Sequence, residues 1–261
     1  MGSSTAKSSG FTLVELIAVI VIVAVIGSLG SSFFLQYLSS QQAMQQRIDL
    51  FSRSRLAINL ISREVENALP NSVRATAGGQ CVEFIPVIGG GILESEPATN
   101  SNQAAASSEL DLLAYSIDRG TANTVVIAAV NTADIYSGAA LGSLASPLPA
   151  GQGSGTINLS SPTVFSQSSS SRRVFFIAGS RAFCVYQGGL YEYNRAGVSS
   201  TAFVPSAMGI LVDSSVNTSG GGFDVQSGAL NNGAELNVDL VFTKGNAEFI
   251  SSDRIYIRNV P

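Results

Sequence analysis

One long apolar stretch near the start of the sequence limits what this chain can fold into more than any other feature. Residues 11–38 contain a single side chain that is charged at neutral pH, that of Glu15. Because about 20 apolar residues are enough to cross a bilayer as a helix, we expect residues 11–38 to form one transmembrane helix. Lys7 on the short amino-terminal side predicts that this end stays in the cytoplasm and that the rest of the chain lies on the other side of the membrane.

The residues before the apolar stretch do not have the order of an ordinary secretory signal. Such a signal places its small-residue cleavage site after the apolar segment. Here the small residue Gly10 comes before that segment. Cleavage at Gly10 would therefore leave the apolar helix on the mature protein.

The stretch GFTLVELIAVIVIVAVIG, residues 10–27, resembles the class III signal of type IV pilins and type II secretion pseudopilins. In that family a prepilin peptidase cuts after the glycine and methylates the new amino terminus. The resemblance implies that residues 1–10 are a leader peptide, that Gly10 is its last residue, and that Phe11 is the N-methylated first residue of the mature chain. It also implies a single-pass protein of the bacterial inner membrane with a periplasmic head, later part of a pilus fibre.

Glu15 is the one acid in the membrane segment. A carboxylate at such a position is costly and is by default a functional hypothesis with a partner charge. The resemblance implies that Glu15 neutralises the amino terminus of a neighbouring subunit while the helices pack into a fibre. The alternative is that its side chain only reaches from the helix end to the lipid headgroups.

Residues 39–69 are predicted to continue the helix in amphipathic form. Apolar residues recur there at steps of three, four or seven, which places them on one broad face: Met44, Ile48, Phe51, Ile58, Ile61, Val65 and Leu69. Pro70 is expected to end the helix. The passage from Arg53 to Arg74 is similar to larger minor pilins, notably the MshO type of the mannose-sensitive haemagglutinin (MSHA) pilus system, and to J-type pseudopilins. An ordinary juxtamembrane helix is the plainer alternative.

From residue 70 to residue 261 the apolar pattern changes to the alternation of strands. The predicted strands lie at residues 80–88, 109–117, 124–130, 173–194 (three strands), 236–242 and 254–260. Gly188 and Gly189 are expected to form a two-residue hairpin turn. The predicted fold class is α+β and pilin-like, with a long N-terminal α-helix packed on an antiparallel β-sheet head.

Three passages of the head are rich in Ser, Gly, Ala and Asn and are predicted to be surface loops: residues 98–108, 139–171 and 214–222. They could be tolerated insertions or partner-binding loops. A head that binds a sugar or a surface would need exposed aromatic residues on such loops. Phe165 and Tyr136 are the main candidates.

The two cysteines, Cys81 and Cys184, lie far apart and form no CxxC motif, which argues against a redox pair or a zinc site. We expect a structural disulfide that braces the head, with two buried free thiols as the alternative. It would join the first strand after the helix to the central strands.

Composition argues against most kinds of catalysis. The sequence has no histidine, which removes the common catalytic triads and imidazole metal sites. Asp213 and Asp224 flank a Ser/Gly-rich loop but lack the spacing of a calcium loop. We therefore expect no enzyme activity, no cofactor and no metal. The net charge of −4 and the lack of a basic run also argue against nucleic-acid binding.

The predicted function is that of a minor pilin of the MshO type, which helps initiate or cap a type IV pilus. The partners implied by the resemblance are the prepilin peptidase, other pilin or minor pilin subunits, the lipids of the inner membrane and the inner-membrane assembly platform. Two alternatives stay open. One is a J-type pseudopilin of a type II secretion system, and the other is an adhesin that carries a ligand-binding head on a pilin stem.

Overall fold

The computed structural model describes residues 10–226 and 234–257. It contains one long helix, α1 (Leu13–Glu66), a short helix α2 (Thr132–Tyr136), a 3-10 turn η1 (Ala77–Gly79) and a β-rich head. The predicted fold class is confirmed, because the head consists of antiparallel sheets. The chain divides into two compact units, residues 1–49 and residues 50–261.

The strands form three sheets. In a five-stranded sheet the order is β1-β2-β7-β8-β9, in a three-stranded sheet β10-β11-β12, and in a four-stranded sheet β3-β6-β4-β5. The bounds are β1 Arg74–Thr76, β2 Cys81–Phe84, β3 Gly89–Leu93, β4 Ser107–Ile127, β5 Leu141–Thr163, β6 Arg173–Ile177, β7 Gly179–Tyr186, β8 Gly189–Ala196, β9 Ile210–Asp213, β10 Val216–Gln226, β11 Ala234–Lys244 and β12 Ala247–Ile257.

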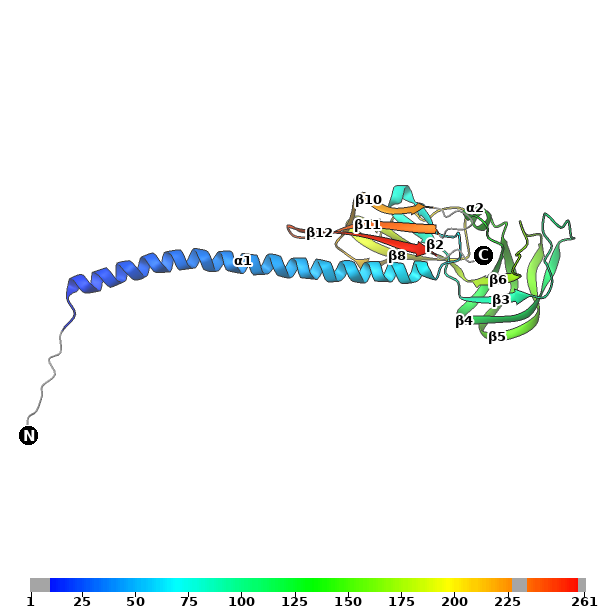
Figure 1. Cartoon of the computed structure of the whole chain (residues 1–261), viewed down its shortest axis with the longest axis horizontal. Coiled ribbons are helices and arrows are strands. Elements are labelled where there is room, and N and C mark those ends of the chain that lie inside the picture. The colour runs from blue at the N-terminus through cyan, green and yellow to red at the C-terminus, as the bar shows by residue number, and fades with distance from the viewer. Residues whose placement is uncertain (1–9, 227–233, 258–261) are drawn as a thin grey trace, which may run out of the picture. The chain divides into compact units, whose positions relative to one another are not determined.

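The head has two lobes. The helix lobe combines the end of α1 with the five-stranded and three-stranded sheets around one apolar core. The barrel lobe contains β3 to β6 around a second core. Figure 1 shows β3, β4, β5 and β6 gathered at one end of the head, away from β10, β11 and β12.

The barrel lobe is inserted between two neighbouring strands of the helix lobe. β2 and β7 pair directly with each other, yet residues 89–177 lie between them in the sequence and build the barrel lobe. Within that lobe the first half of β4 pairs with β3 and its second half pairs with β6, while β3 also pairs with β6. Because β4 bends between its two halves, the strands close on themselves.

The end of α1 is held by the helix lobe. Ile58, Ile61, Val65 and Leu69 are buried, as the predicted apolar face requires. The prediction of this apolar face is wrong at its amino-terminal end. Met44, Ile48 and Phe51 are exposed, and Leu50 and Ala57 are buried instead. Two ion pairs also join the helix to strands, Arg53 with Asp213 at 3.3 Å and Glu64 with Arg181 at 2.8 Å.

The helix ends at Glu66, three residues before the predicted Leu69. The reason is that the following backbone pairs with the end of β2: the Leu69 N–H donates to the Ile85 carbonyl at 2.7 Å. The Val87 N–H donates to the Asn67 carbonyl at 3.1 Å. Strand pairing therefore ends the helix before Pro70 does.

The predicted position of one hairpin turn in the head is wrong. The hairpin between β7 and β8 turns at Gln187 and Gly188, not at Gly188 and Gly189, since Tyr186 pairs with Gly189. Both turn residues have positive φ, 46° and 81°, as the favoured two-residue hairpin turns require.

Two of the three predicted surface loops are largely strand. Residues 141–163 form β5 along β4, and residues 216–226 form β10. Their small polar side chains gave no alternating pattern, but cross-strand pairing satisfies the backbone whatever the side chains are. The loop at 98–108 precedes β4 and overlaps only its first two residues. The predicted last strand is the end of β12, and its residues 258–260 lie outside the described part of the chain.

Candidate functional site

The predicted cleavage site lies on extended backbone just before α1. Gly10, Phe11 and Thr12 precede the first helical residue, Leu13, and both Gly10 and Phe11 are exposed. A β-carbon added at Gly10 would meet no atom of the chain within 4 Å. The fold therefore gives no reason for a glycine at this position, whereas recognition by an enzyme would.

Thr12 and Glu15 fix where the helix begins. The Glu15 N–H donates to the Thr12 hydroxyl at 3.3 Å and to the Thr12 carbonyl at 3.1 Å. The spacing T-x-x-E is that of a capping box, and an acid in the first turn also favours the helix dipole. Only the Thr12 half of the box is formed, and Glu15 contributes as an acid in the first turn, a role that the sequence analysis missed. The carboxylate has no ion pair within residues 10–226 and 234–257, so its charge is free for a partner outside the chain.

The helix that follows is covered by no other part of its own unit. Its large apolar side chains at residues 13–26 and 33–38 are all exposed. The helix is long and apolar enough to cross a membrane. Such a surface must be covered by lipid or by other helices, because burying apolar area stabilises by about 25 cal/mol per Å².

Residues 5–31 match a protein-family model described as the prokaryotic N-terminal methylation motif. The chain carries a class III prepilin signal. This prepilin signal supports a type IV pilin or pseudopilin and suggests a structural subunit. Together with the exposed apolar helix it fits membrane anchoring. No curated protein and no solved structure matches the chain.

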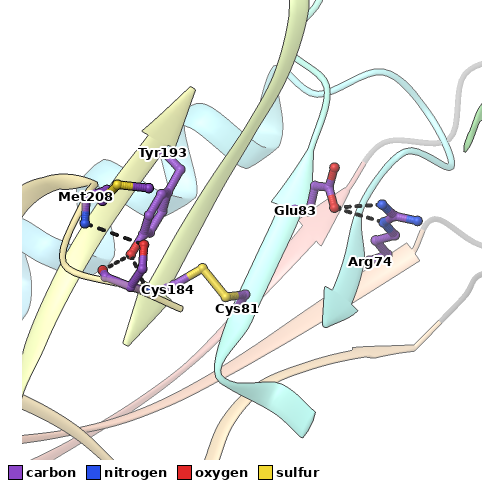
Figure 2. The surroundings of a disulfide bond; sticks show 7 residues. Arg74, Cys81, Glu83, Cys184, Tyr193 and Met208 are labelled. Carbon is purple, nitrogen blue, oxygen red and sulfur yellow. Dashed lines mark hydrogen bonds and ion pairs between the residues drawn. A yellow bond between two sulfur atoms is a disulfide. The ribbon is translucent and has the colours of Figure 1, made fainter. Parts of the chain in front are cut away.

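Cys81 and Cys184 lie opposite each other on β2 and β7, with Cα atoms 4.1 Å apart and the sulfur atoms bonded. Figure 2 shows the disulfide crossing between these two strands. Both cysteines are buried beside Ala182, Tyr193 and Phe203. Because the chain leaves the helix lobe after β2 and returns to it at β7, the bond ties the two strands that carry the barrel lobe.

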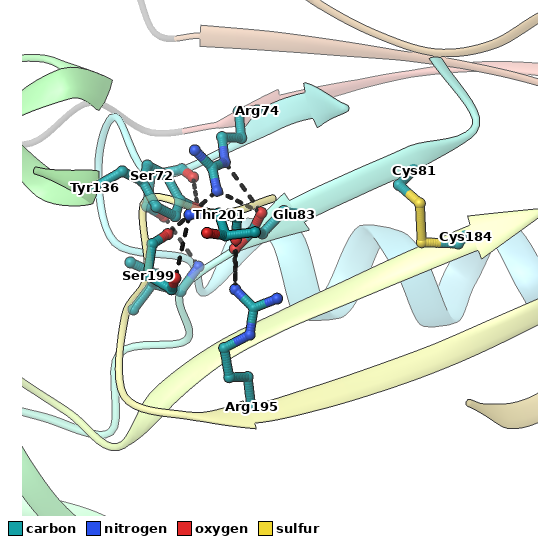
Figure 3. A network of polar contacts seen from close by, with 10 residues as sticks. Ser72, Arg74, Cys81, Glu83, Tyr136, Cys184, Arg195, Ser199 and Thr201 are labelled. Carbon is teal, nitrogen blue, oxygen red and sulfur yellow. Dashed lines mark hydrogen bonds and ion pairs between the residues drawn. A yellow bond between two sulfur atoms is a disulfide. The ribbon is translucent and has the colours of Figure 1, made fainter. Parts of the chain in front are cut away.

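A buried charge network lies on the same face of this sheet. Glu83 is fully buried, and its Oε2 accepts from Arg74 Nε at 3.0 Å and from Arg74 Nη2 at 2.7 Å. Arg195 Nη1 lies 3.9 Å from the other oxygen, Oε1. Figure 3 shows the Glu83 carboxylate between the two guanidinium groups. Arg74 is therefore hydrogen-bonded to the carboxylate, whereas Arg195 lies within ion-pair distance of Oε1, which accepts no hydrogen bond from the described residues.

Sequence analysis did not identify this network, although a signal was present. Glu83 interrupts the apolar stretch CVEFI of β2, and a charge in a strand that is otherwise buried needs a partner. The identity of the partners depends on strand pairing. Arg74 lies opposite Glu83 on β1, whereas Arg195 comes from β8.

Tyr136, in α2, packs against the charge network. Its ring lies 3.4 Å from the Arg74 guanidinium carbon, and its hydroxyl donates to the Ser72 carbonyl at 2.7 Å. Burial, and secondly the charge of Glu83, raise the pKa of Tyr136 far above its usual value near 10. The phenol therefore stays neutral and acts as a structural donor.

The two aromatic residues considered for a ligand-binding head are not available on the surface. Phe165 is 1% exposed and Tyr136 is 6% exposed. Phe165 packs in the core of the barrel lobe, and Tyr136 packs with Leu69 and Ile85 where the lobes meet. This prediction was wrong because Tyr136, at the end of α2, and Phe165, just after β5, both turn their rings into a core.

The two acids considered as calcium ligands have other contacts in the structure. Asp213 pairs with Arg53 and accepts from the backbone N–H of Ser215 at 2.8 Å, and Asp224 lies within β10 opposite Asn237. Among the described residues no three His, Cys, Asp or Glu side chains cluster as metal ligands do.

Proposed function

We propose that this chain is a minor pilin of the MshO type, processed by a prepilin peptidase and incorporated into a type IV pilus, where it helps initiate or cap the fibre. In this proposal residues 1–10 are the leader, residues 11–38 the transmembrane and assembly helix, residues 39–69 the amphipathic part, and residues 70–261 the periplasmic head. The chain first resides in the inner membrane. There it meets the peptidase, the assembly platform and other pilin subunits.

The observation that carries the proposal is the combination found at the start of α1. An exposed Gly10–Phe11 bond precedes a helix whose apolar side chains are exposed and whose one acid, Glu15, has no ion pair in the described chain. A methylated amino terminus of a neighbouring subunit would supply the missing positive charge. Pairing the two would offset the cost of each charge in the membrane.

The test is peptide mass spectrometry on sheared surface fibres and on the membrane fraction. We expect a chain that begins at N-methylated Phe11, present in fibres at low abundance. In the Gly10→Val variant we expect the uncleaved chain in the membrane fraction only, with unchanged stability of the head, because a side chain at Gly10 meets no atom of this chain. Wild-type chains that all begin upstream of Gly10 would overturn the proposal.

The J-type pseudopilin is the second candidate, because the same signal serves both kinds of fibre. The two are separated by deleting the gene and measuring two outputs, the number of surface pili and the amount of secreted protein. Fewer pili with normal secretion supports the pilus assignment. Normal pili with impaired secretion would replace it by the pseudopilin assignment.

A further inference from the structure

A cleft lies at the base of the barrel lobe, where the chain enters and leaves that lobe. Pro86 and Ile88 line it on the way in, and Ser180 on the way out. Arg119 and Asn123 come from the bend of β4, and Arg195 from β8. The volume is about 420 Å³, within the range of roughly 300–1,000 Å³ that is usual for small-molecule sites.

The cleft is positively charged, in contrast to the whole chain with its net charge of −4. Three arginines, Arg119, Arg181 and Arg195, line it, and no acid does. Two of them are held in place: Arg181 pairs with Glu64 at 2.8 Å, and Arg195 donates to the Thr201 carbonyl at 2.7 Å. Arg119 is exposed and makes no ion pair or hydrogen bond in the described structure. The charges of Arg181 and Arg195 are partly balanced by Glu64 and Glu83, which do not line the cleft, so the free guanidinium of Arg119 is the group that favours an anion.

Ser180 gives a second and independent indication of a ligand. Its side chain is 1% exposed, and its hydroxyl has no hydrogen-bond partner within the described residues. Its backbone N–H is already used, since it donates to the Gly197 carbonyl at 3.1 Å. A buried hydroxyl without a partner is destabilising and requires an explanation, and a hydroxyl on the wall of a cleft can find its partner in a bound molecule.

We propose that this cleft binds a small polyhydroxylated carboxylate of the size of an acidic monosaccharide. The guanidinium of Arg119 pairs with the carboxylate, because its planar fork matches two carboxylate oxygens. Ser180, Asn123 and Asn194 supply donors and acceptors for hydroxyl groups. Pro86 and Ile88 give the cleft an apolar wall for the ring carbons. The proposal does not depend on the role of the chain in a fibre.

The test is isothermal titration of the full chain in detergent micelles with glucuronate. Glucose, which has the same ring without the carboxylate, and sulfate, which has the charge without the hydroxyls, are the comparison ligands. We expect glucuronate to bind at least tenfold more tightly than either of them. No glucuronate binding, or sulfate binding of equal strength, would overturn the proposal.

Two variants test the residues. Arg119→Ala is expected to weaken glucuronate binding about tenfold, whereas the matched control Arg254→Ala, an exposed arginine of β12 that does not line the cleft, is expected to leave it unchanged. Equal affinities in these two variants would contradict the proposal.

Ser180→Ala separates a ligand contact from a structural role. We expect the unliganded variant to unfold at the same temperature as the wild type or higher, because a buried hydroxyl without a partner is removed. Glucuronate binding should still weaken about tenfold. Unchanged affinity together with a lower unfolding temperature would show that the hydroxyl is structural, and would overturn its assignment to the site.

Discussion

The two halves of α1 have the same secondary structure but opposite surroundings. The large apolar side chains of residues 13–26 and 33–38 are exposed and are covered by nothing within their own unit, whereas residues 50–66 bury one face in the core of the helix lobe and carry ion pairs to strands. The second half is therefore stabilised by its own chain. The first half requires a covering of lipid or of other helices, which its own unit does not supply.

The largest expected effect is on the half that the chain stabilises by itself. Replacing both cysteines, Cys81→Ser with Cys184→Ser, should lower the free energy of unfolding of the head by about 4–5 kcal/mol in the chain-entropy model, because the bond closes a loop of 103 residues. Denaturant unfolding followed by tyrosine fluorescence measures this. Membrane insertion of the first half, measured by carbonate extraction, should not change. Loss of insertion in this variant would show that the two halves are not independent.

A smaller effect is expected from one side chain in each half. Ile61→Ala removes a fully buried side chain from the helix lobe and should cost about 3 kcal/mol. Ile17→Ala in the first half and Leu56→Ala on the exposed face of the second half should each change head stability by less than about 0.5 kcal/mol. Equal losses for Ile61 and Leu56 would mean that the helix face is assigned wrongly.

Glu15→Gln tests what the charge of Glu15 contributes to the first half of α1. Glutamine keeps the backbone N–H that donates to the Thr12 hydroxyl but removes the charge, so the helix should start as before while incorporation into fibres falls about tenfold, equivalent to about 1.4 kcal/mol. Quantitative immunoblotting of sheared fibres against the membrane fraction measures the ratio. Thr12→Ala is the matched control, since it weakens the cap by about 1 kcal/mol and keeps the charge. A larger loss for Thr12→Ala would assign Glu15 to capping alone.

The smallest effect is a pH dependence in the head. Because the pKa of Tyr136 is raised in the folded state, mainly by burial, its contribution to stability is full below pH 10 and is lost as the pH rises further, when the unfolded chain releases the proton. Tyr136→Phe should lose about 1 kcal/mol near pH 7 with the hydrogen bond to Ser72. Above pH 10 the free energy of unfolding of this variant should fall less steeply with pH than that of the wild type. The two slopes should differ by about 1.4 kcal/mol per pH unit. Equal slopes in both proteins would contradict this assignment.

Much of the fold could be predicted where it depends on local pattern. The apolar stretch and the strands β6, β7, β8 and β11 were all expected from the sequence, but the helix begins at Leu13, two residues after the expected Phe11, because Thr12 caps it. The strand β5 was not, because its residues 141–155, LGSLASPLPAGQGSG, have neither alternation nor β-branched side chains. The strand is stabilised by its pairing with β4 along its length and not by the β propensity of its side chains.

The candidate functional residues, too, could be predicted only where they lie close together in the sequence. Gly10, Phe11 and Glu15 stand together within six residues, so the sequence alone was enough to predict a role for them. Glu83, Arg74 and Arg195 come from three strands, and only strand register brings them together. Nothing near each residue indicates the others.

The sequence by itself determined that this chain has an amino-terminal prepilin signal on a membrane-competent helix, because both are properties of contiguous residues. Only the tertiary structure decided that residues 89–177 form a separate lobe, that a disulfide ties the strands which carry it, and that an arginine-lined cleft lies at its base. These features depend on contacts between residues far apart in the chain, and such contacts are set by the packing and pairing of the whole head.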